Sequence, residues 1–198
     1  MKLAAIDIGS NAARLQISSV LKPNGATKFK RIEYERFPLQ LGHDITKTQC
    51  ISTLGEQKLV QLLRAFKLLI NLYEVDDYMI CATSALREAH NRLVVTKRIR
   101  AETGLSVNII SGEEEAALIH KAVRYLLNDD NYLHVDVGGG STEISFYEGT
   151  KKLSTRSFNL GAIKILTRVD SPLSWEEMRV WIYAQRRQFF YIDLGISY

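Results

Sequence analysis

Two short segments of the chain combine an aspartate, glycine and small polar side chains in the same order. The first is IDIGSN, residues 6–11, and the second is VDVGGGST, residues 135–142. In each segment an aspartate, Asp7 or Asp136, stands two residues before the first glycine. Glycine lets backbone amides approach a ligand closely, and clustered amides of this kind bind phosphate. The repeated pattern favours a phosphate clamp built twice over a pair of plain tight turns.

The polar side chains around these turns extend the prediction. Carboxylates at the two strand ends, Asp7 and Asp136, can hold a hydrated divalent cation, which prefers oxygen ligands. Arg14 follows the first turn and Arg87 follows a buried strand; either can bind phosphate through its planar guanidinium or form an ordinary surface ion pair. The predicted phosphate-binding residues are Gly9, Ser10, Asn11, Arg14, Arg87, Gly138, Gly139, Gly140 and Ser141.

Two glutamates are candidates for acid–base chemistry. If SGEEEAALI, residues 111–119, is helical, Glu115 falls on the apolar stripe, whereas Glu113 and Glu114 decorate the first turn. A carboxylate on an apolar stripe loses hydration, which raises its pKa and lets it accept a proton from water. Glu143 follows the second glycine turn. It could hold an attacking or metal-bound water, or face solvent as an ordinary strand residue.

The elements that must position these residues follow from hydrophobic periodicity. Alternating or apolar runs at 2–8, 13–20 and 28–39 predict a three-stranded meander, and a helical period follows from Thr53. Ser111 and Glu114 have capping-box spacing, so a helix should begin there. After NDDN, residues 128–131, the opening pattern repeats. We therefore expect two related lobes, residues 1–127 and 128–198.

Bulk properties limit the class of protein. The chain has 198 residues, a formal net charge of +4 and only two cysteines, far apart in sequence. No apolar run approaches the roughly 20 residues of a membrane span, and the N-terminal apolar run meets Asp7 too early for a signal peptide. The basic clusters lack the interleaved aromatic residues typical of nucleic-acid binding. These features predict a cytoplasmic protein without nucleic-acid or membrane partners.

Six segments together resemble one known family. They are IDIGSNAARLQI, FPLQLGHDI, ATSALREAHN, IISGEEEAALI, VDVGGGSTEIS and NLGAIKI. In their order along residues 3–166 they closely resemble the exopolyphosphatase / guanosine pentaphosphatase (Ppx/GppA) family. The resemblance implies an α/β fold with the duplicated ribonuclease-H-like lobes of actin, sugar kinases and heat-shock chaperones.

The resemblance also implies an activity. Family members remove a terminal phosphate from inorganic polyphosphate or guanosine pentaphosphate, with Mg²⁺, by direct attack of water. By that pattern Glu115 is the base that activates water, and Glu143 positions the water or the cation. We therefore expect Glu115 and Glu143 to be catalytic, and Asp7, Asp136 and Glu143 to hold magnesium.

Two departures from the family pattern leave alternatives open. Ala12 stands where the family usually has a hydroxyl residue, and the chain ends before the rest of the second lobe, so that lobe is expected to be incomplete. A homodimer could complete it. A non-catalytic phosphate-binding or regulatory remnant is one alternative function, and a kinase or ATPase with the same lobes is another. The motifs do not choose between polyphosphate and guanosine pentaphosphate.

Overall fold

The first strand already shows how the sequence sorts side chains to two faces. In β1 (Lys2–Ile8) the buried residues are Ala4, Ile6 and Ile8, whereas Asp7 points to the opposite face. This alternation puts the core on one side of the strand and a carboxylate on the other. The structure is a computed structural model, and it describes residues 1–22, 27–167 and 171–186.

The first sheet has five strands in the order β3-β2-β1-β4-β5. Neighbours are antiparallel from β3 to β1, and parallel from β1 to β5. The expected three-stranded meander is therefore present, and two crossover strands extend its sheet. Besides β1, the strands are β2 (Ala12–Leu21), β3 (Lys28–Pro38), β4 (Asp77–Ala82) and β5 (Asn108–Ile109).

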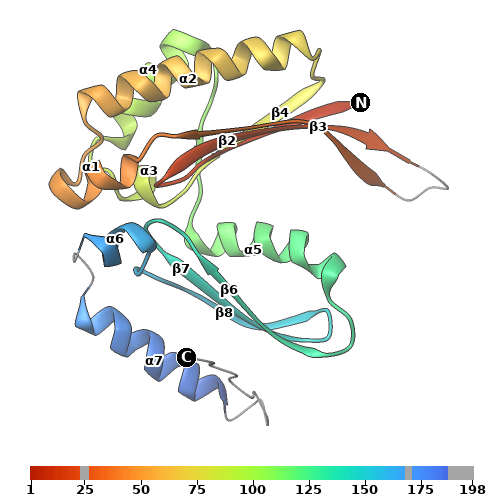
Figure 1. The fold of residues 1–198 in the computed structure, drawn as a ribbon, viewed down its shortest axis with the longest axis vertical. Helices are drawn as coiled ribbons and strands as arrows, with labels where there is room; N and C mark the ends of the chain where they lie inside the picture. Colours follow the sequence, from red (N-terminus) through yellow and green to blue (C-terminus); the bar gives the residue numbers. More distant parts are fainter. Residues whose placement is uncertain (23–26, 168–170, 187–198) are drawn as a thin grey trace.

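Four helices lie on one side of this sheet (Figure 1). Leu59, Leu63 and Phe66 of α2 recur at helical spacing and are buried in the main core. The core thus joins one face of the sheet to this helical layer and leaves the face with Asp7 free for other contacts. The helices are α1 (Leu41–Thr48), α2 (Thr53–Leu72), α3 (Ser84–Glu88) and α4 (Arg92–Thr103).

Helix α5 (Gly112–Val123) lies between the two sheets (Figure 1). It packs on β7 and β8 of the second, antiparallel sheet, whose order is β6-β7-β8. On the other face of that sheet, Phe146 and Phe158 contact Trp181 of α7. The remaining elements are the 3-10 helix η2 (Arg124–Leu126), β6 (Asn131–Val137), β7 (Thr142–Glu148), β8 (Lys151–Phe158), α6 (Ala162–Leu166) and α7 (Pro172–Arg186).

The internal repeat is confirmed at the level of strand register. Asp7 lies opposite Arg14 across β1 and β2, and Asp136 lies opposite Glu143 across β6 and β7. Both glycine turns therefore join two antiparallel strands, with an aspartate at the same place before each turn. The lobe boundary at residue 128 stays a prediction: α5 precedes it, yet packs on the second sheet. Residues 187–198 of the predicted second lobe lie outside the described residues.

The starts of two helices depend on different contacts. The Ser52 hydroxyl caps α2 by accepting from the Gly55 amide. Asn91 immediately precedes α4, but its side chain bonds the backbone of Ile51 and does not cap the helix. Helix α1 was not expected; it is a short element whose packing, rather than its local pattern, defines it. Among the helices of the described residues, none combines the length and apolar composition of a membrane span.

Candidate active site

The two glycine turns close in the same way. The Gly9 amide donates to the Ala12 carbonyl at 3.0 Å, and the Gly138 amide donates to the Ser141 carbonyl at 2.8 Å. These two predicted phosphate donors are therefore used inside their own turns. Within the described residues, the backbone amides of the two positions inside each turn, between its first and last residues, have no hydrogen-bond acceptor. Those amides belong to Ser10, Asn11, Gly139 and Gly140.

The glycines of the second turn have a further role, which sequence analysis missed. A Cβ on Gly139 would lie 2.9 Å from the Ser10 Cβ, and one on Gly140 would lie 2.7 Å from the Ser84 Oγ. The two turns thus pack directly against each other, and side chains at these positions would force them apart. Ser10 and Ser84 are buried and their hydroxyls bond each other at 2.6 Å. The predicted phosphate contact through the Ser10 hydroxyl therefore competes with a structural bond.

Each turn is anchored by the helix that follows its meander. In the first lobe the Gly42 amide of α1 donates to the Ser10 carbonyl at 2.8 Å. In the second, the Ile163 amide of α6 donates to the Gly139 carbonyl at 2.9 Å. A Cβ on Gly161 would lie only 2.4 Å from the Gly139 backbone. The helix start and the turn therefore fix each other's position, and the repeat extends beyond the strands.

Asp7 and Arg14 form an ion pair beside the first turn. The Arg14 Nη1 lies 2.7 Å from the Asp7 Oδ2. Burial raises the pKa of Asp7, and the charge of Asp136 adds to the rise, while the bond to Arg14 opposes it. The two aspartates of the repeat are thus close enough to influence each other. Asp136 is exposed. Of the two roles that the sequence left open for Arg14, the structure shows the ion pair, and its predicted phosphate contact stays a prediction.

Glu115 enters the site from the first turn of α5. The expected capping box holds this turn: the Ser111 hydroxyl accepts from the Glu114 amide, and the Glu114 carboxylate accepts from the Ser111 amide. The Glu115 side chain is 21% exposed, and the Arg87 Nη1 lies 3.3 Å from its Oε2. Arg87 also donates to the Ile110 carbonyl at 3.0 Å. Arg87, predicted to bind phosphate, therefore also orients Glu115.

The surroundings of Glu115 suit proton transfer near neutral pH. Its pKa is raised from 4.5 to about 7, chiefly because burial removes hydration and secondly because Glu143 is negatively charged. Arg87 opposes this rise, and Asp7 adds a smaller contribution in the same direction as Glu143. The rise in pKa that the apolar stripe predicted for Glu115 is thus found. A carboxylate tuned in this way can accept a proton from water at neutral pH.

Glu143 is buried, not solvent-facing. It is 3% exposed, and the Ser157 hydroxyl donates to its Oε1 at 2.7 Å. Ser157 lies directly opposite Glu143 across β7 and β8, while Asp136 lies opposite it on the other side. Directly opposite residues share a face of the sheet, so the three side chains project together. Ser157 could not be found from the motifs, because only the strand register brings it to Glu143.

A cavity of about 510 Å³ connects the site residues of both lobes. Of the predicted residues, Asp7, Arg14, Glu115 and Asp136 line it together, although they come from different elements. The cavity is not lined by the glycine turns, Arg87 or Glu143. The other residues that line the cavity are Ala5, Ile6, Gln16, Tyr34, Met79, Cys81, Thr83, Ile110, Leu118 and Ile119.

The expected metal ligands are brought together only in part. Among the described residues, no group of three or more His, Cys, Asp or Glu side chains could hold a metal ion. Asp7, Asp136 and Glu143 are therefore not a preformed three-carboxylate site. Asp7 and Asp136 do fit Mg²⁺ that arrives with a phosphate substrate, because this ion keeps several waters and uses one or two carboxylates plus substrate phosphates.

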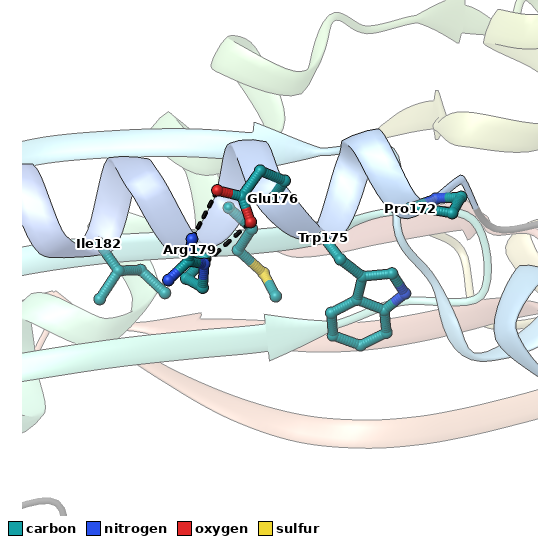
Figure 2. Close-up of a pocket in the computed structure, with 6 residues that line it drawn as sticks. Pro172, Trp175, Glu176, Arg179 and Ile182 are labelled. Carbon is teal, nitrogen blue, oxygen red and sulfur yellow. Dashed lines mark hydrogen bonds and ion pairs between the residues drawn. The ribbon is translucent and has the colours of Figure 1, made fainter.

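A second cavity, of about 610 Å³, lies along α7 and is lined by residues of that helix alone. Figure 2 shows its charged residues, Glu176 and Arg179, paired with each other. Trp175 and Ile182 form apolar parts of its wall (Figure 2). Because its acid and base neutralise each other, this cavity offers no group comparable to Glu115.

Comparison with protein-family models gives one match: the Ppx/GppA phosphatase family, over residues 20–180. A curated relative, the bifunctional 3-dehydroquinate synthase/phosphatase of Fusobacterium nucleatum, is 34% identical over 170 residues, which cover 82% of this chain and 25% of the relative. Exopolyphosphatase 1 of Mycobacterium tuberculosis is 31% identical, covering 73% of the chain and 42% of the relative. The chain thus spans less than half of the length of these relatives.

A third relative and two solved structures point the same way. The guanosine-5'-triphosphate,3'-diphosphate pyrophosphatase of Vibrio atlanticus is 30% identical, covering 83% of the chain and 33% of the relative. An exopolyphosphatase of Cytophaga hutchinsonii superposes with a TM-score of 0.78 at 26% identity, covering 85% of the chain and 53% of that structure. The Ppx/GppA family member of Aquifex aeolicus gives 0.72 at 29% identity, covering 94% and 61%.

Proposed function

The chain belongs to the Ppx/GppA phosphatase family, and we propose that it is a phosphohydrolase that removes the terminal phosphate of inorganic polyphosphate or guanosine pentaphosphate. Its fold, the α/β ribonuclease-H-like type with duplicated lobes, is the one expected from sequence. Two relatives are named exopolyphosphatase and guanosine-5'-triphosphate,3'-diphosphate pyrophosphatase, and these names indicate the two substrates. The activity of this chain is our proposal, because it spans only part of each relative.

The observation that carries the proposal is the environment of Glu115. This side chain lies on the wall of the cavity between the lobes, with its pKa raised to about 7. In the proposed reaction it accepts a proton from water as the water attacks the terminal phosphorus in line with the leaving oxygen. The bond from phosphorus to the bridging oxygen breaks, and inorganic phosphate leaves. No phosphoenzyme is required.

Glu143 and Arg87 act on Glu115 in this proposal. Burial and, secondly, the negative charge of Glu143 hold the pKa of Glu115 high, and the Glu143 carboxylate is fixed by Ser157. Arg87 fixes the orientation of Glu115, because its Nη1 lies 3.3 Å from the Glu115 Oε2. Glu143 also remains the predicted residue for positioning the attacking water. Catalysis then depends mainly on positioning and preorganised charge.

The phosphate end of the substrate would be held at the two turns. The amides of exposed Asn11 and half-buried Gly139 are among those without an acceptor, so they can donate to phosphate oxygens. We propose that Asp7 and Asp136 bind magnesium together with substrate phosphates, and that the bound ion supplies neutralising charge. Arg14 lies beside them and adds positive charge.

The proposed setting is the reducing cytoplasm. Cys50 and Cys81 are both free thiols in the structure. Burial is the main reason why the pKa of Cys81 is raised, so its thiol stays protonated although it lines the site cavity. A half-buried, protonated thiol is a poor nucleophile, which agrees with direct attack by water.

The proposal is tested by phosphate release from long-chain polyphosphate and from guanosine pentaphosphate, each with magnesium. Glu115→Gln keeps the shape of the side chain but removes the base, so the rate should fall by about 10²–10⁴-fold. Glu113→Gln is the matched control, since Glu113 is an exposed glutamate of the same helical turn. It should release phosphate at the wild-type rate.

Three outcomes would decide against the proposal. Equal rates for wild type and Glu115→Gln would remove Glu115 from the reaction. ATP hydrolysis without release from either phosphate substrate would support the kinase or ATPase alternative. A wild-type protein that binds polyphosphate but releases no phosphate would support the non-catalytic remnant.

A further inference from the structure

The edge strand β3 places a second arginine next to the site. Arg36 of β3 lies directly opposite Arg14 of β2, so the two side chains project from the same face of the sheet. Arg14 is neutralised by Asp7 at 2.7 Å. Within the described residues, Arg36 has neither an ion pair nor a hydrogen bond, and it is exposed. Like charges directly opposite each other destabilise a sheet unless a further group neutralises them.

A β-bulge adds another cation to the same face. The register between β2 and β3 shifts after Ile17, which faces Glu33, so that Ser18 faces Arg31 and Ile32 is passed over. A bulge of this kind redirects the side chains beyond it. Without it, Arg31 would project to the helical side of the sheet. With it, the Arg31 guanidinium lies 5.7 Å from the ring centre of Tyr34.

The charges of β3 are separated between its two faces. Glu33 and Glu35 lie opposite the buried residues Ile17 and Leu15, so they face the helical layer, where Tyr73 donates to Glu33 at 2.7 Å. The opposite face of β3 carries Arg31, Tyr34 and Arg36 and no acid. Tyr34 lines the same cavity as Asp7 and Glu115. The basic face is therefore continuous with the site.

We propose that Arg36 and Arg31 form an anion subsite for the phosphate groups that follow the one being removed. This inference rests on the proposed function. A substrate phosphate between Arg14 and Arg36 would neutralise the unpaired cation, and the next groups would reach Arg31 along the strand. The strand rise gives this basic face a length of about 15 Å, which exceeds a single phosphate group. The shared ligand chemistry is a run of linked phosphates, from polyphosphate or from the nucleotide.

The test is equilibrium binding by calorimetry, in a Glu115→Gln background so that the ligand is not consumed. Arg36→Gln should weaken binding of long-chain polyphosphate about tenfold, because a charge-assisted contact is lost. Arg31→Gln should weaken long-chain binding several-fold, but tripolyphosphate binding by less than twofold, since the short ligand ends before this residue. Guanosine pentaphosphate is the second arm: a loss with Arg36→Gln there, and not with polyphosphate, would identify the nucleotide as the source of the phosphates.

Arg100→Gln is the matched control. Arg100 is an exposed arginine of α4, on the helical side of the sheet, and its removal should leave binding of all three ligands unchanged. Thermal unfolding without ligand provides a second readout. Arg36→Gln should not lower the melting temperature, because it removes a repulsion instead of a stabilising bond.

The outcomes separate this inference from the proposed function. If Arg36→Gln and Arg100→Gln bind every ligand alike, or if the unsubstituted background binds none of them, the subsite is wrong. If phosphate release survives Glu115→Gln while Arg36→Gln still weakens binding, the proposed role of Glu115 fails and the subsite stands. If release depends on Glu115 but not on the two β3 arginines, only the subsite fails.

Discussion

At the residue scale, the chemistry depends on an unfavourable position of one carboxylate. Burial and the charge of Glu143 both disfavour ionised Glu115, and the contact with Arg87 compensates for only part of this. Sequence periodicity was enough to single out Glu115, since a carboxylate on an apolar helical stripe stands out from Glu113 and Glu114. The partners Arg87, Glu143 and Ser157 come from other elements, so their contacts depend on tertiary structure.

The buried position of Glu115 lowers the stability of the folded protein, and this effect can be measured. The pKa of Glu115 is raised from 4.5 to about 7 on folding, so the unfolded state loses its proton first as pH rises. Ionisation of Glu115 therefore has no effect on the free energy of unfolding below pH 4.5. It lowers this free energy increasingly between pH 4.5 and about 7, and its full destabilising effect is present above that pH. Glu115→Gln should therefore stabilise the protein at pH 8 by up to about 3 kcal/mol.

Chemical denaturation of wild type and Glu115→Gln at several pH values checks this prediction. The gain should shrink toward zero as pH falls to 4.5. Glu113→Gln should show no comparable gain, because that side chain is exposed. A gain that is independent of pH, or a loss at pH 8, would contradict the account of Glu115.

At the element scale, short-range signals predicted some features well and others poorly. The Ser111–Glu114 capping box fixes the start of α5 as expected, because all its bonds are local. Gly139 and Gly140 were predicted to bind phosphate, but a sequence offers no sign that they also pack on Ser10 and Ser84. The glycines of the second turn therefore serve the contact between the lobes, besides their predicted role in binding phosphate.

The capping box also predicts how α5 supports the site. Ser111→Ala removes the acceptor of the Glu114 amide and should destabilise the protein by about 1 kcal/mol. Because Glu115 belongs to the same first turn, fraying there should also slow phosphate release. Unfolding curves and release rates measure the two effects.

Ser52→Ala provides the matched comparison for this prediction. The Ser52 hydroxyl caps α2 through the Gly55 amide at 3.0 Å, and α2 carries none of the proposed site residues. A similar loss of stability with an unchanged release rate is expected. Equal rates for both variants would show that the start of α5 does not position Glu115.

At the scale of the whole molecule, an ion pair between a nearly buried lysine and a partly exposed glutamate joins the lobes. The Lys164 side chain of α6 is 9% exposed and lies 2.8 Å from Glu88 of α3. Lys164 also donates to Asn159. The repeated meanders indicated two lobes from sequence, but not this bond. Glu88 and Lys164 lie in the segments ATSALREAHN and NLGAIKI, which are far apart in sequence, and nothing in either segment indicates that the two side chains meet. The contact joins α3 to α6, the helix whose Ile163 amide bonds the second glycine turn.

Breaking this pair should loosen the contact between lobes. Glu88→Gln leaves the Lys164 charge nearly buried without an ionic partner and should cost about 2 kcal/mol of folding free energy, while the double variant with Lys164→Met should cost less than the sum of the two single changes. A double-mutant cycle from denaturant unfolding gives the coupling energy. Strict additivity would mean that the pair does not link the lobes.

The central claim is that Glu115 is a base whose pKa lies near neutrality in the cavity between the lobes. Its most direct test is a ¹³C NMR titration of the glutamate carboxyls, with the Glu115 signal assigned by its absence in Glu115→Gln. We expect a midpoint of about 7 for this carboxyl. A midpoint near its ordinary value of 4.5 would contradict the account.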